Sequence, residues 1–144
     1  MVVTQGRFRF QKLAKYPHMK PADIEIWERF IALNPDFFDR VDYDFHVGEG
    51  ADFLPSDENT AEGRENRLYR KKIDVVGYKK EEVWIIEVKP EADMLALGQV
   101  LSYKKIYAKE IGEEQPLTMA VICGSITKEM EAVFKEHSII IYAV

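Results

Sequence analysis

Three charged residues lie within, or at the end of, two apolar runs in the middle of the chain. Asp74 belongs to the run Ile73-Asp74-Val75-Val76, and Glu87 and Lys89 belong to Ile85-Ile86-Glu87-Val88-Lys89. Short runs rich in β-branched residues are typical of buried strands. An unpaired carboxylate is costly to bury, so these acids need compensation. A divalent metal ion is one candidate for that compensation.

The spacing of the two runs predicts which of their residues face one another. A hairpin turn centred between Lys80 and Glu81, with a loop of even length, places Asp74 directly opposite Glu87 on one face of the sheet. Lys89 shares that face because it lies two residues beyond Glu87. Two carboxylates this close repel each other, and a Mg²⁺ ion turns the repulsion into attraction. Lys89 then adds a positive charge beside the ion.

Composition indicates a globular protein with a single domain over residues 1–144. The chain has 144 residues, of which 47% are hydrophobic and 31% are charged. No apolar run approaches the length of a membrane span, and the N-terminus lacks the apolar core of a signal peptide. The one cysteine, Cys123, lies in an apolar run and cannot form an intrachain disulfide. We therefore expect a cytoplasmic protein that does not bind membranes.

The net charge of −5 argues against a protein that coats nucleic acid by bulk electrostatics. It does not exclude a nuclease, because metal ions offset the carboxylates of a site. Basic residues cluster just before the first apolar run. We take Arg67, Arg70 and Lys72 from this cluster as candidates for contact with substrate phosphates, the alternative being an ordinary solvated surface. The three histidines are not at ligand spacing, so no zinc site is expected.

The periodicity of apolar residues predicts an α-β-β-β-α-β-α-β order. We expect a helix at 22–33, strands at 41–47, 68–78 and 82–89, a helix at 92–110, a strand at 117–123, a helix at 127–136 and a last strand at 138–143. Residues 1–20 are expected to form an N-terminal arm with a short strand at 7–11, and residues 48–66 a mobile loop. Pro90 is expected to end strand pairing. This order indicates a mixed α/β fold, a central mixed sheet flanked by helices.

These residues and this order resemble the PD-(D/E)XK nuclease superfamily. Its signature is an acid on the second core strand and Glu-x-Lys on the third, which match Asp74 and Glu87-Val88-Lys89. One branch adds Gln-x-x-x-Tyr on the following helix, and Gln99 and Tyr103 fit that pattern. The resemblance implies a restriction-endonuclease-like α-β-β-β-α-β core, followed here by a C-terminal α-β. Ile73 stands in place of the proline of the signature.

The resemblance also implies an activity, the hydrolysis of phosphodiester bonds in nucleic acid, with DNA as the expected substrate. Mg²⁺ or Mn²⁺ would be the cofactor. Asp74 and Glu87 would bind the ion, together with the backbone carbonyl of Val88. Lys89 would orient or activate the attacking water and would stabilise charge in the transition state.

Three further residues enter through the resemblance. Gln99 and Tyr103 would position the site or the substrate backbone, although an ordinary surface pair on a helix is the alternative. Some members of the superfamily add a glutamate from the first helix. Here Glu28 borders the apolar arc of that helix and is preferred to Glu25, which points further into solvent.

Two other functions remain open at this level. A junction-resolvase-like endonuclease is also a small single domain that carries Glu-Val-Lys. A non-catalytic binding or assembly module, for example in a phage particle, could keep the nuclease fold without turnover. The small size of the chain suits either a homodimer or a partner protein that supplies specificity.

Overall fold

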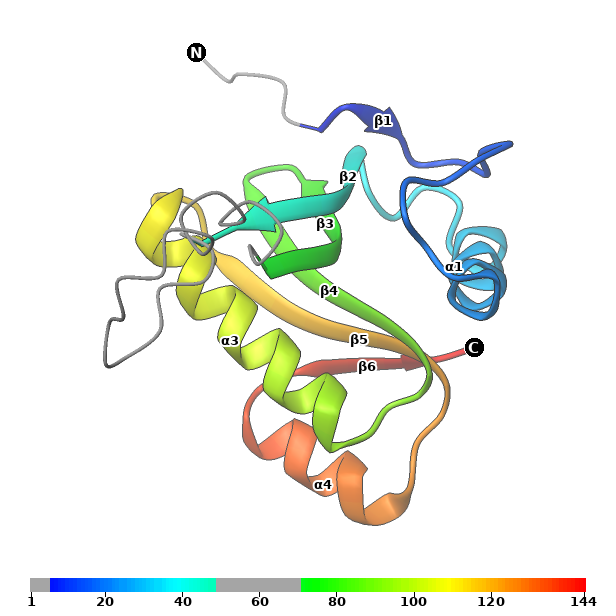
Figure 1. The fold of residues 1–144 in the computed structure, drawn as a ribbon, viewed down its shortest axis with the longest axis vertical. Helices are drawn as coiled ribbons and strands as arrows, with labels where there is room; N and C mark the ends of the chain where they lie inside the picture. Colours follow the sequence, from blue (N-terminus) through cyan, green and yellow to red (C-terminus); the bar gives the residue numbers. More distant parts are fainter. Residues whose placement is uncertain (1–5, 49–70) are drawn as a thin grey trace, which may run out of the picture.

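The computed structural model describes residues 6–48 and 71–144, which form a six-stranded sheet with helices on both faces (Figure 1). In chain order the elements are β1 (Phe8–Arg9), α1 (Pro21–Leu33), β2 (Arg40–Val47), β3 (Lys71–Lys79), β4 (Glu82–Glu91), α3 (Met94–Glu110), β5 (Leu117–Ser125), α4 (Lys128–Glu136) and β6 (Ile140–Ala143). The spatial order of the strands is β1-β2-β3-β4-β5-β6. Neighbours from β1 to β4 are antiparallel, whereas β4, β5 and β6 are parallel. The predicted mixed sheet and element order are confirmed.

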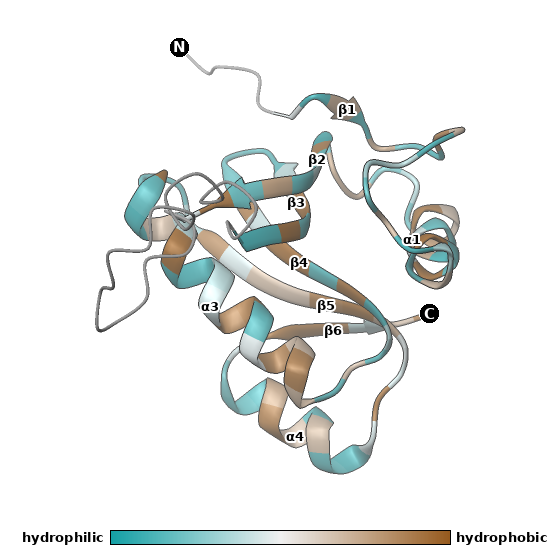
Figure 2. Cartoon of the chain, in the orientation of Figure 1, coloured by the Kyte–Doolittle hydropathy of each residue, from teal (hydrophilic) through white to brown (hydrophobic). Residues whose placement is uncertain are grey.

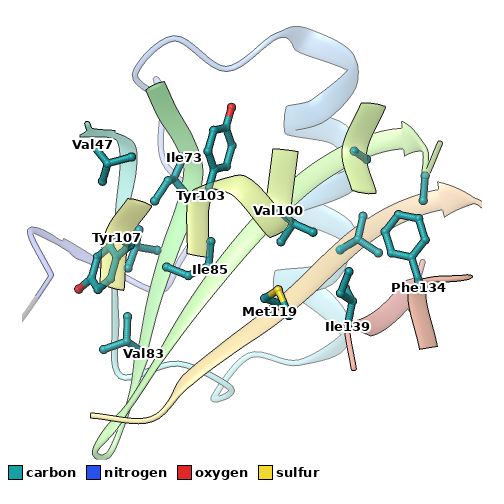
Figure 3. Close-up of a cluster of buried hydrophobic side chains, with 14 of the residues drawn as sticks. Val47, Ile73, Val83, Ile85, Val100, Tyr103, Tyr107, Met119, Phe134 and Ile139 are labelled. Atoms are coloured by element: carbon teal, nitrogen blue, oxygen red, sulfur yellow. The ribbon is translucent and has the colours of Figure 1, made fainter. Parts of the chain in front are cut away.

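Each face of the sheet has its own hydrophobic core. Helices α3 and α4 pack on one face, where Tyr107 of α3 and Phe134 of α4 belong to the same cluster as Ile85 of β4 (Figure 3). Helix α1 covers the other face, where Trp27 clusters with Ile86 of β4. Successive residues of β4 thus enter opposite cores, as the alternation of a strand requires. Hydrophobic and hydrophilic residues alternate along α3 and α4, as expected for helices with one buried face (Figure 2).

The described part of the segment before α1 packs against the sheet. Phe10 and Tyr16 are buried and join the core beneath α1. The short strand expected at 7–11 is confirmed as β1, which pairs with the first two residues of β2. Apart from Gly48, the predicted mobile loop at 48–66 lies outside the described residues.

Pro90 does not end strand pairing, which corrects the expectation from the sequence. The parallel ladder between β4 and β5 pairs Lys89 with Cys123 and resumes at Glu91, which pairs with Ser125. On the opposite side of β4, the pairing with β3 has already stopped before this point. The missing N–H of Pro90 therefore interrupts no ladder on that side, and a proline is tolerated where a strand has a free edge.

Capping side chains define the starts of α3 and α4. Asp93 accepts a hydrogen bond from the N–H of Ala96 at 3.0 Å, and Thr127 accepts one from the N–H of Met130 at 3.1 Å. Helix α3 therefore begins at Met94 rather than at residue 92. Among the described residues, no helix is long and apolar enough to cross a membrane.

One glycine of β3 makes room for the aromatic core beneath α1. A Cβ atom added at Gly77 would lie 2.5 Å from a ring carbon of Phe38, whose side chain is buried. We expect Gly77→Ala to lower the free energy of unfolding by about 1–3 kcal/mol, because the ring has to move within a packed core. Urea denaturation measures this change.

Gly98 provides the matched control for that substitution. It lies on the exposed side of α3, and an added Cβ meets no atom within 4 Å. Gly98→Ala is expected to raise the free energy of unfolding by about 0.5–1 kcal/mol, since alanine is the better helix former. If both variants had the same effect, the steric role of Gly77 would be refuted.

Candidate active site

Strands β3 and β4 pair in the predicted register and then separate at the acidic residues. The last rung of this ladder joins Val75 to Ile86. Next along β3, the carboxylate of Asp74 accepts a hydrogen bond from the backbone N–H of Val88 at 3.0 Å. The same carboxylate is within hydrogen-bonding reach of the Glu87 side chain. The predicted proximity of Asp74 and Glu87 is therefore confirmed.

Glu87 is the most unusual ionisable residue of the site. Its surface is only 1% exposed, and its Oε2 atom lies 3.8 Å from the ammonium nitrogen of Lys89. Its Oε1 atom is buried and has no hydrogen-bond partner within residues 6–48 and 71–144. Burial, followed by the negative charge of Asp74, raises the pKa of the Glu87 carboxyl to about 9. An approaching cation would stabilise the ionised form that this environment disfavours.

Asp74 is held in place by the backbone of the neighbouring strand. Burial raises the pKa of its carboxyl, and the hydrogen bond from the N–H of Val88 acts in the opposite direction. The pair therefore combines a carboxylate that is anchored to the backbone with one, Glu87, that keeps an unused oxygen.

The other buried acid among the described residues, Asp42, shows how a structural carboxylate differs from Glu87. Asp42 accepts hydrogen bonds from the N–H of Arg7 at 2.8 Å and from the hydroxyl of Tyr78 at 2.7 Å. Both of its oxygens are thus engaged, and it ties the N-terminal segment to β2 and β3. Glu87 has no comparable set of partners, which favours a functional role for it.

Helix α3 brings Gln99 and Tyr103 toward the two acids. The charges of Glu87 and Asp74, after the larger effect of burial, raise the pKa of the Tyr103 hydroxyl to about 12. The side-chain amide of Gln99 is within hydrogen-bonding reach of Tyr103, while the Gln99 Oε1 atom is buried and has no partner among the described residues. The two residues therefore interact as neighbours on one helical face, with Tyr103 close enough for the acids to act on it electrostatically.

Small residues near the start of α3 do not open the site to a substrate. Ala92 and Ala96 are 1% and 0% exposed and belong to the core between α3 and the sheet. Their small size lets the helix approach the sheet closely. Their side chains are therefore covered by the core and do not present a surface to a substrate.

On the first helix, Asp23 rather than Glu28 lies close enough to the two acids to interact with them electrostatically. The carboxylate of Asp23 interacts electrostatically with Lys89, Asp74 and Glu87. Glu28 instead accepts a hydrogen bond from the hydroxyl of Tyr16 at 2.8 Å. The preference for Glu28 considered only its position on the apolar arc. Asp23 belongs to the first turn of α1, which is the end of the helix nearer the site. In the sequence, Pro21 marked where this turn begins.

The candidate substrate contacts are only partly described. Lys72 lies on β3, is exposed and pairs with His46 of β2. The other two candidates, Arg67 and Arg70, lie outside the described residues. Lys72 therefore places one positive charge on the same strand as Asp74, two residues away.

The residues present fit a magnesium ion better than a zinc ion. Within the described residues, no group of three or more histidine, cysteine, aspartate or glutamate side chains is arranged to hold a metal. Mg²⁺ needs fewer protein ligands, since it is commonly bound by one or two carboxylates and several waters. Asp74 and Glu87 supply two carboxylates, and the unpartnered oxygens of Glu87 and Gln99 are acceptors that a hydrated cation could satisfy.

Comparison with known proteins relates the fold to that of a nuclease. No family model and no curated protein sequence matches the chain. Among solved structures, the chain is similar to the crystal structure of a repair endonuclease from Pyrococcus abyssi, with 16% sequence identity and a TM-score of 0.50 over 91% of this chain. It spans about half, 49%, of the length of that protein. The likeness shows a restriction-endonuclease-like mixed α/β fold.

Proposed function

We propose that this protein is a metal-dependent nuclease that hydrolyses phosphodiester bonds, with DNA as the expected substrate. The observation that carries the proposal is the pair formed by the partly buried Asp74 and the buried Glu87, next to Lys89, at the point where β3 and β4 separate. A structural ion pair would not need a buried glutamate oxygen without a partner. The similarity in fold to a repair endonuclease supports the same proposal.

In this proposal, Asp74, Glu87 and the carbonyl of Val88 hold Mg²⁺ or Mn²⁺. The ion, when bound, supplies Lewis-acid stabilisation of the phosphodiester and makes water a better nucleophile at neutral pH. The N–H of Val88 keeps the Asp74 carboxylate oriented. The ammonium group of Lys89 donates hydrogen bonds to the attacking water or to a phosphoryl oxygen, and it stabilises the negative charge that develops there.

Gln99 and Tyr103 complete the site from the side of α3. The two side chains lie within hydrogen-bonding reach of each other on one helical face. The Oε1 atom of Gln99 is then available to accept a hydrogen bond from a water of the site. We assign these two residues to positioning, because neither carries a charge near neutral pH and both come from the rigid helix that faces the acids.

Gln99→Ala is expected to slow cleavage by about ten- to a thousandfold, or about 1.4–4 kcal/mol of transition-state free energy. Folding stability should change by less than about 1 kcal/mol, because the substitution removes an amide oxygen that has no partner. Single-turnover kinetics and urea denaturation measure the two quantities on one variant. Ser102→Ala, an exposed change on the same helix, is the control.

The opposite pattern for Gln99→Ala would refute the positioning role. In that pattern, turnover would be normal and the whole effect would appear as a lower free energy of unfolding. Gln99 and Tyr103 would then be an ordinary pair on a helix surface.

A panel of substrates tests the proposed function directly. The protein is incubated with single-stranded, duplex, flapped and four-way-junction oligonucleotides in Mg²⁺, in Mn²⁺ or in EDTA. We expect cleavage only with a metal ion, and preference for the four-way junction would indicate a resolvase. Absence of cleavage on every substrate, together with no saturable heat in a calorimetric Mg²⁺ titration, would contradict the proposal and favour a non-catalytic module. A homodimer or a partner protein that supplies specificity remains part of the proposal.

A further inference from the structure

A pocket of about 530 Å³ lies between the N-terminal segment and β2. Its lining combines the positive charge of Arg7 and the imidazoles of His18 and His46 with the carboxylates of Asp42 and Asp44 and the aromatic rings of Phe8 and Phe45. Both oxygens of Asp42 already accept hydrogen bonds within the protein. The volume falls within the range of about 300–1,000 Å³ that is typical of small-molecule and cofactor sites. None of these residues has a role in the catalytic assignment above.

The backbone around this pocket is strained in a way that orders the polar groups. Asp44 has φ 50 although it lies inside strand β2, and His18, which faces it, also has φ 50. His18 lies in a turn, as do Lys80 and Ser138, the other described non-glycine residues with positive φ, so Asp44 is the one described case that lies within a strand. Strain of about 1–3 kcal/mol persists only where the surroundings impose it, and it is concentrated at functional sites.

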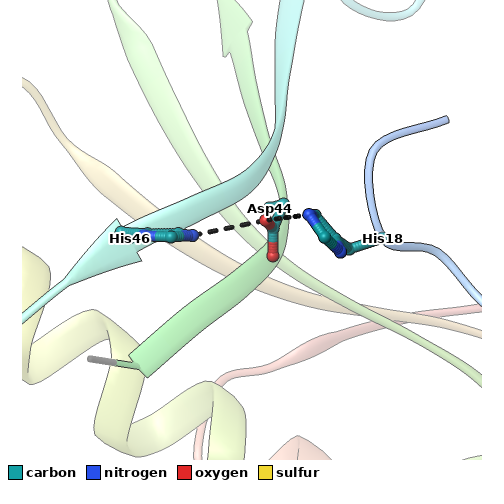
Figure 4. Close-up of polar contacts among 3 residues, drawn as sticks. All are labelled: His18, Asp44 and His46. Atoms are coloured by element: carbon teal, nitrogen blue, oxygen red, sulfur yellow. Dashed lines mark hydrogen bonds and ion pairs between the residues drawn. The ribbon is translucent and has the colours of Figure 1, made fainter. Parts of the chain in front are cut away.

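The bend at Asp44 has a direct structural consequence. Before the bend, Tyr43 packs into the core beneath α1, whereas after it Phe45 packs against the core beneath α3. The carboxylate of Asp44 lies between two imidazole rings (Figure 4), 3.3 Å from the Nε2 atom of His46 and 3.9 Å from that of His18. Asp44, the strained residue, thus lies beside two histidines that line the same pocket.

The pocket lies one strand away from the catalytic acids. In the ladder between β2 and β3, Tyr43 pairs with Val75 and Phe45 pairs with Ile73. Asp44 therefore occupies the position opposite Asp74, and neighbouring strands are about 4.7–4.9 Å apart. A nucleic-acid strand whose phosphate occupied the catalytic site could reach the pocket with an adjacent nucleotide.

The lining matches the two parts of a nucleotide. Arg7 is permanently charged, and its guanidinium group is suited to phosphate oxygens. The two imidazoles, whose Nε2 atoms lie beside Asp44, add ring nitrogens to the same lining. Phe8 packs against Tyr43 and Phe45 packs against Tyr107, but both are only partly buried, and a base could stack on the exposed part of either ring. Bases in an intact duplex have their faces covered by their neighbours, so the occupant must be unpaired.

We propose that this pocket binds an unpaired nucleotide of the substrate strand, next to the bond that is cleaved. The inference rests on the proposed nuclease function and deepens it, because it makes single-stranded or flapped DNA the preferred substrate. A second concave surface on α3, lined by Lys104, Lys105 and Lys109, is the competing location for the strand. The tests below distinguish the two surfaces.

Binding without cleavage is the first test. Fluorescence anisotropy in EDTA compares a short single-stranded oligonucleotide with the blunt duplex of the same sequence. The double variant His18→Ala, His46→Ala is expected to bind the single strand about tenfold more weakly, with the duplex affected less than about twofold. His137→Ala, which changes the third histidine of the chain at an exposed position outside the pocket, should match the wild type. An equal effect of the double variant on both substrates, or no effect, would overturn the inference.

Photocrosslinking locates the base without any substitution in the protein. A single-stranded oligonucleotide that contains 5-iododeoxyuridine is irradiated with the wild-type protein, and the crosslinked peptide is identified by mass spectrometry. We expect crosslinks at Phe8, Tyr43 or Phe45. Crosslinks confined to the segment from Lys104 to Lys109 would overturn the inference. So would thymidine monophosphate competing as strongly as the oligonucleotide, since the site would then serve a free nucleotide.

These outcomes are separable from those of the proposed function. If the single strand binds in the pocket but no substrate is cleaved in Mg²⁺ or Mn²⁺, the nuclease proposal fails while the binding pocket stands. If cleavage occurs and the double histidine variant behaves like the wild type toward every substrate, the pocket inference alone fails.

Discussion

Lys89→Ala is expected to reduce cleavage by at least about a thousandfold, which is the upper range for removal of one group that stabilises charge in a transition state. The affinity for Mg²⁺ should stay within about threefold of the wild-type value, because an ammonium group cannot be a metal ligand. In addition, two electrostatic effects of the substitution oppose each other. Loss of Lys89 removes its repulsion of the ion. It also removes the positive charge that favours the ionised form of Glu87, 3.8 Å away. Single-turnover cleavage and calorimetric Mg²⁺ titration measure the two quantities.

The chain offers a matched control for Lys89. Lys135 on α4 forms an ion pair with Glu131 at 3.6 Å, but both side chains are largely exposed. Lys135→Ala should leave cleavage and metal affinity unchanged, because an exposed ion pair contributes little. A Lys89→Ala variant that cleaves at the wild-type rate would show that Lys89 has no catalytic role.

Glu87→Gln is expected to abolish cleavage and to weaken Mg²⁺ binding by at least about a hundredfold, more than the loss of a residue that only supports a ligand. In the metal-free protein, the same substitution should increase stability above neutral pH. The folded-state pKa of Glu87 is raised from 4.5 to about 9 by burial and then by the charge of Asp74. The folded protein therefore binds this proton more strongly than the unfolded chain does.

The sign of the pH dependence follows from that difference in proton affinity. The contribution of Glu87 to stability is fully present below about pH 4.5 and is lost as the pH rises toward about 9. Metal-free wild type should lose free energy of unfolding across this window. The free energy of unfolding of Glu87→Gln should fall less over the same pH range. At pH 8 it should exceed that of the wild type by about 2 kcal/mol or more. Urea denaturation at several pH values in EDTA measures both profiles.

Glu136→Gln is the control for the pH profiles, because Glu136 lies exposed on α4. Its profile should follow that of the wild type. Parallel profiles for the wild type and Glu87→Gln would show that Glu87 is not held in a site that disfavours its charge.

The structure also changes which substitution should be used to probe Asp74. If the repulsion between the two carboxylates were the only factor, removing either one would not lower the free energy of unfolding. The Asp74 carboxylate accepts a hydrogen bond from the N–H of Val88. Alanine at position 74 would therefore leave this buried N–H without its partner. Asparagine keeps an acceptor oxygen while it removes the charge. Asp74→Asn is therefore the better variant for separating metal binding from folding.

The sequence by itself determined the features that depend on residues close together in the chain. Alternation and hairpin spacing were enough to predict the register that brings Asp74 to Glu87, since a slip of one residue would expose the buried face of each strand. The four-residue spacing of Gln99 and Tyr103 likewise determined that they share a helical face. The order of helices and strands and the mixed sheet followed from local periodicity.

Only the tertiary structure decided features that join distant segments. The direction in which α1 crosses the sheet places Asp23, and not Glu28, near Lys89. The bend at Asp44 within β2 places its carboxylate beside His18 of the N-terminal segment. The physical reason is the same in both cases: periodicity specifies which face of an element is buried, but the packing of side chains between elements sets their orientation and spacing. Charge partners that depend on such packing cannot be assigned by counting residues along the chain.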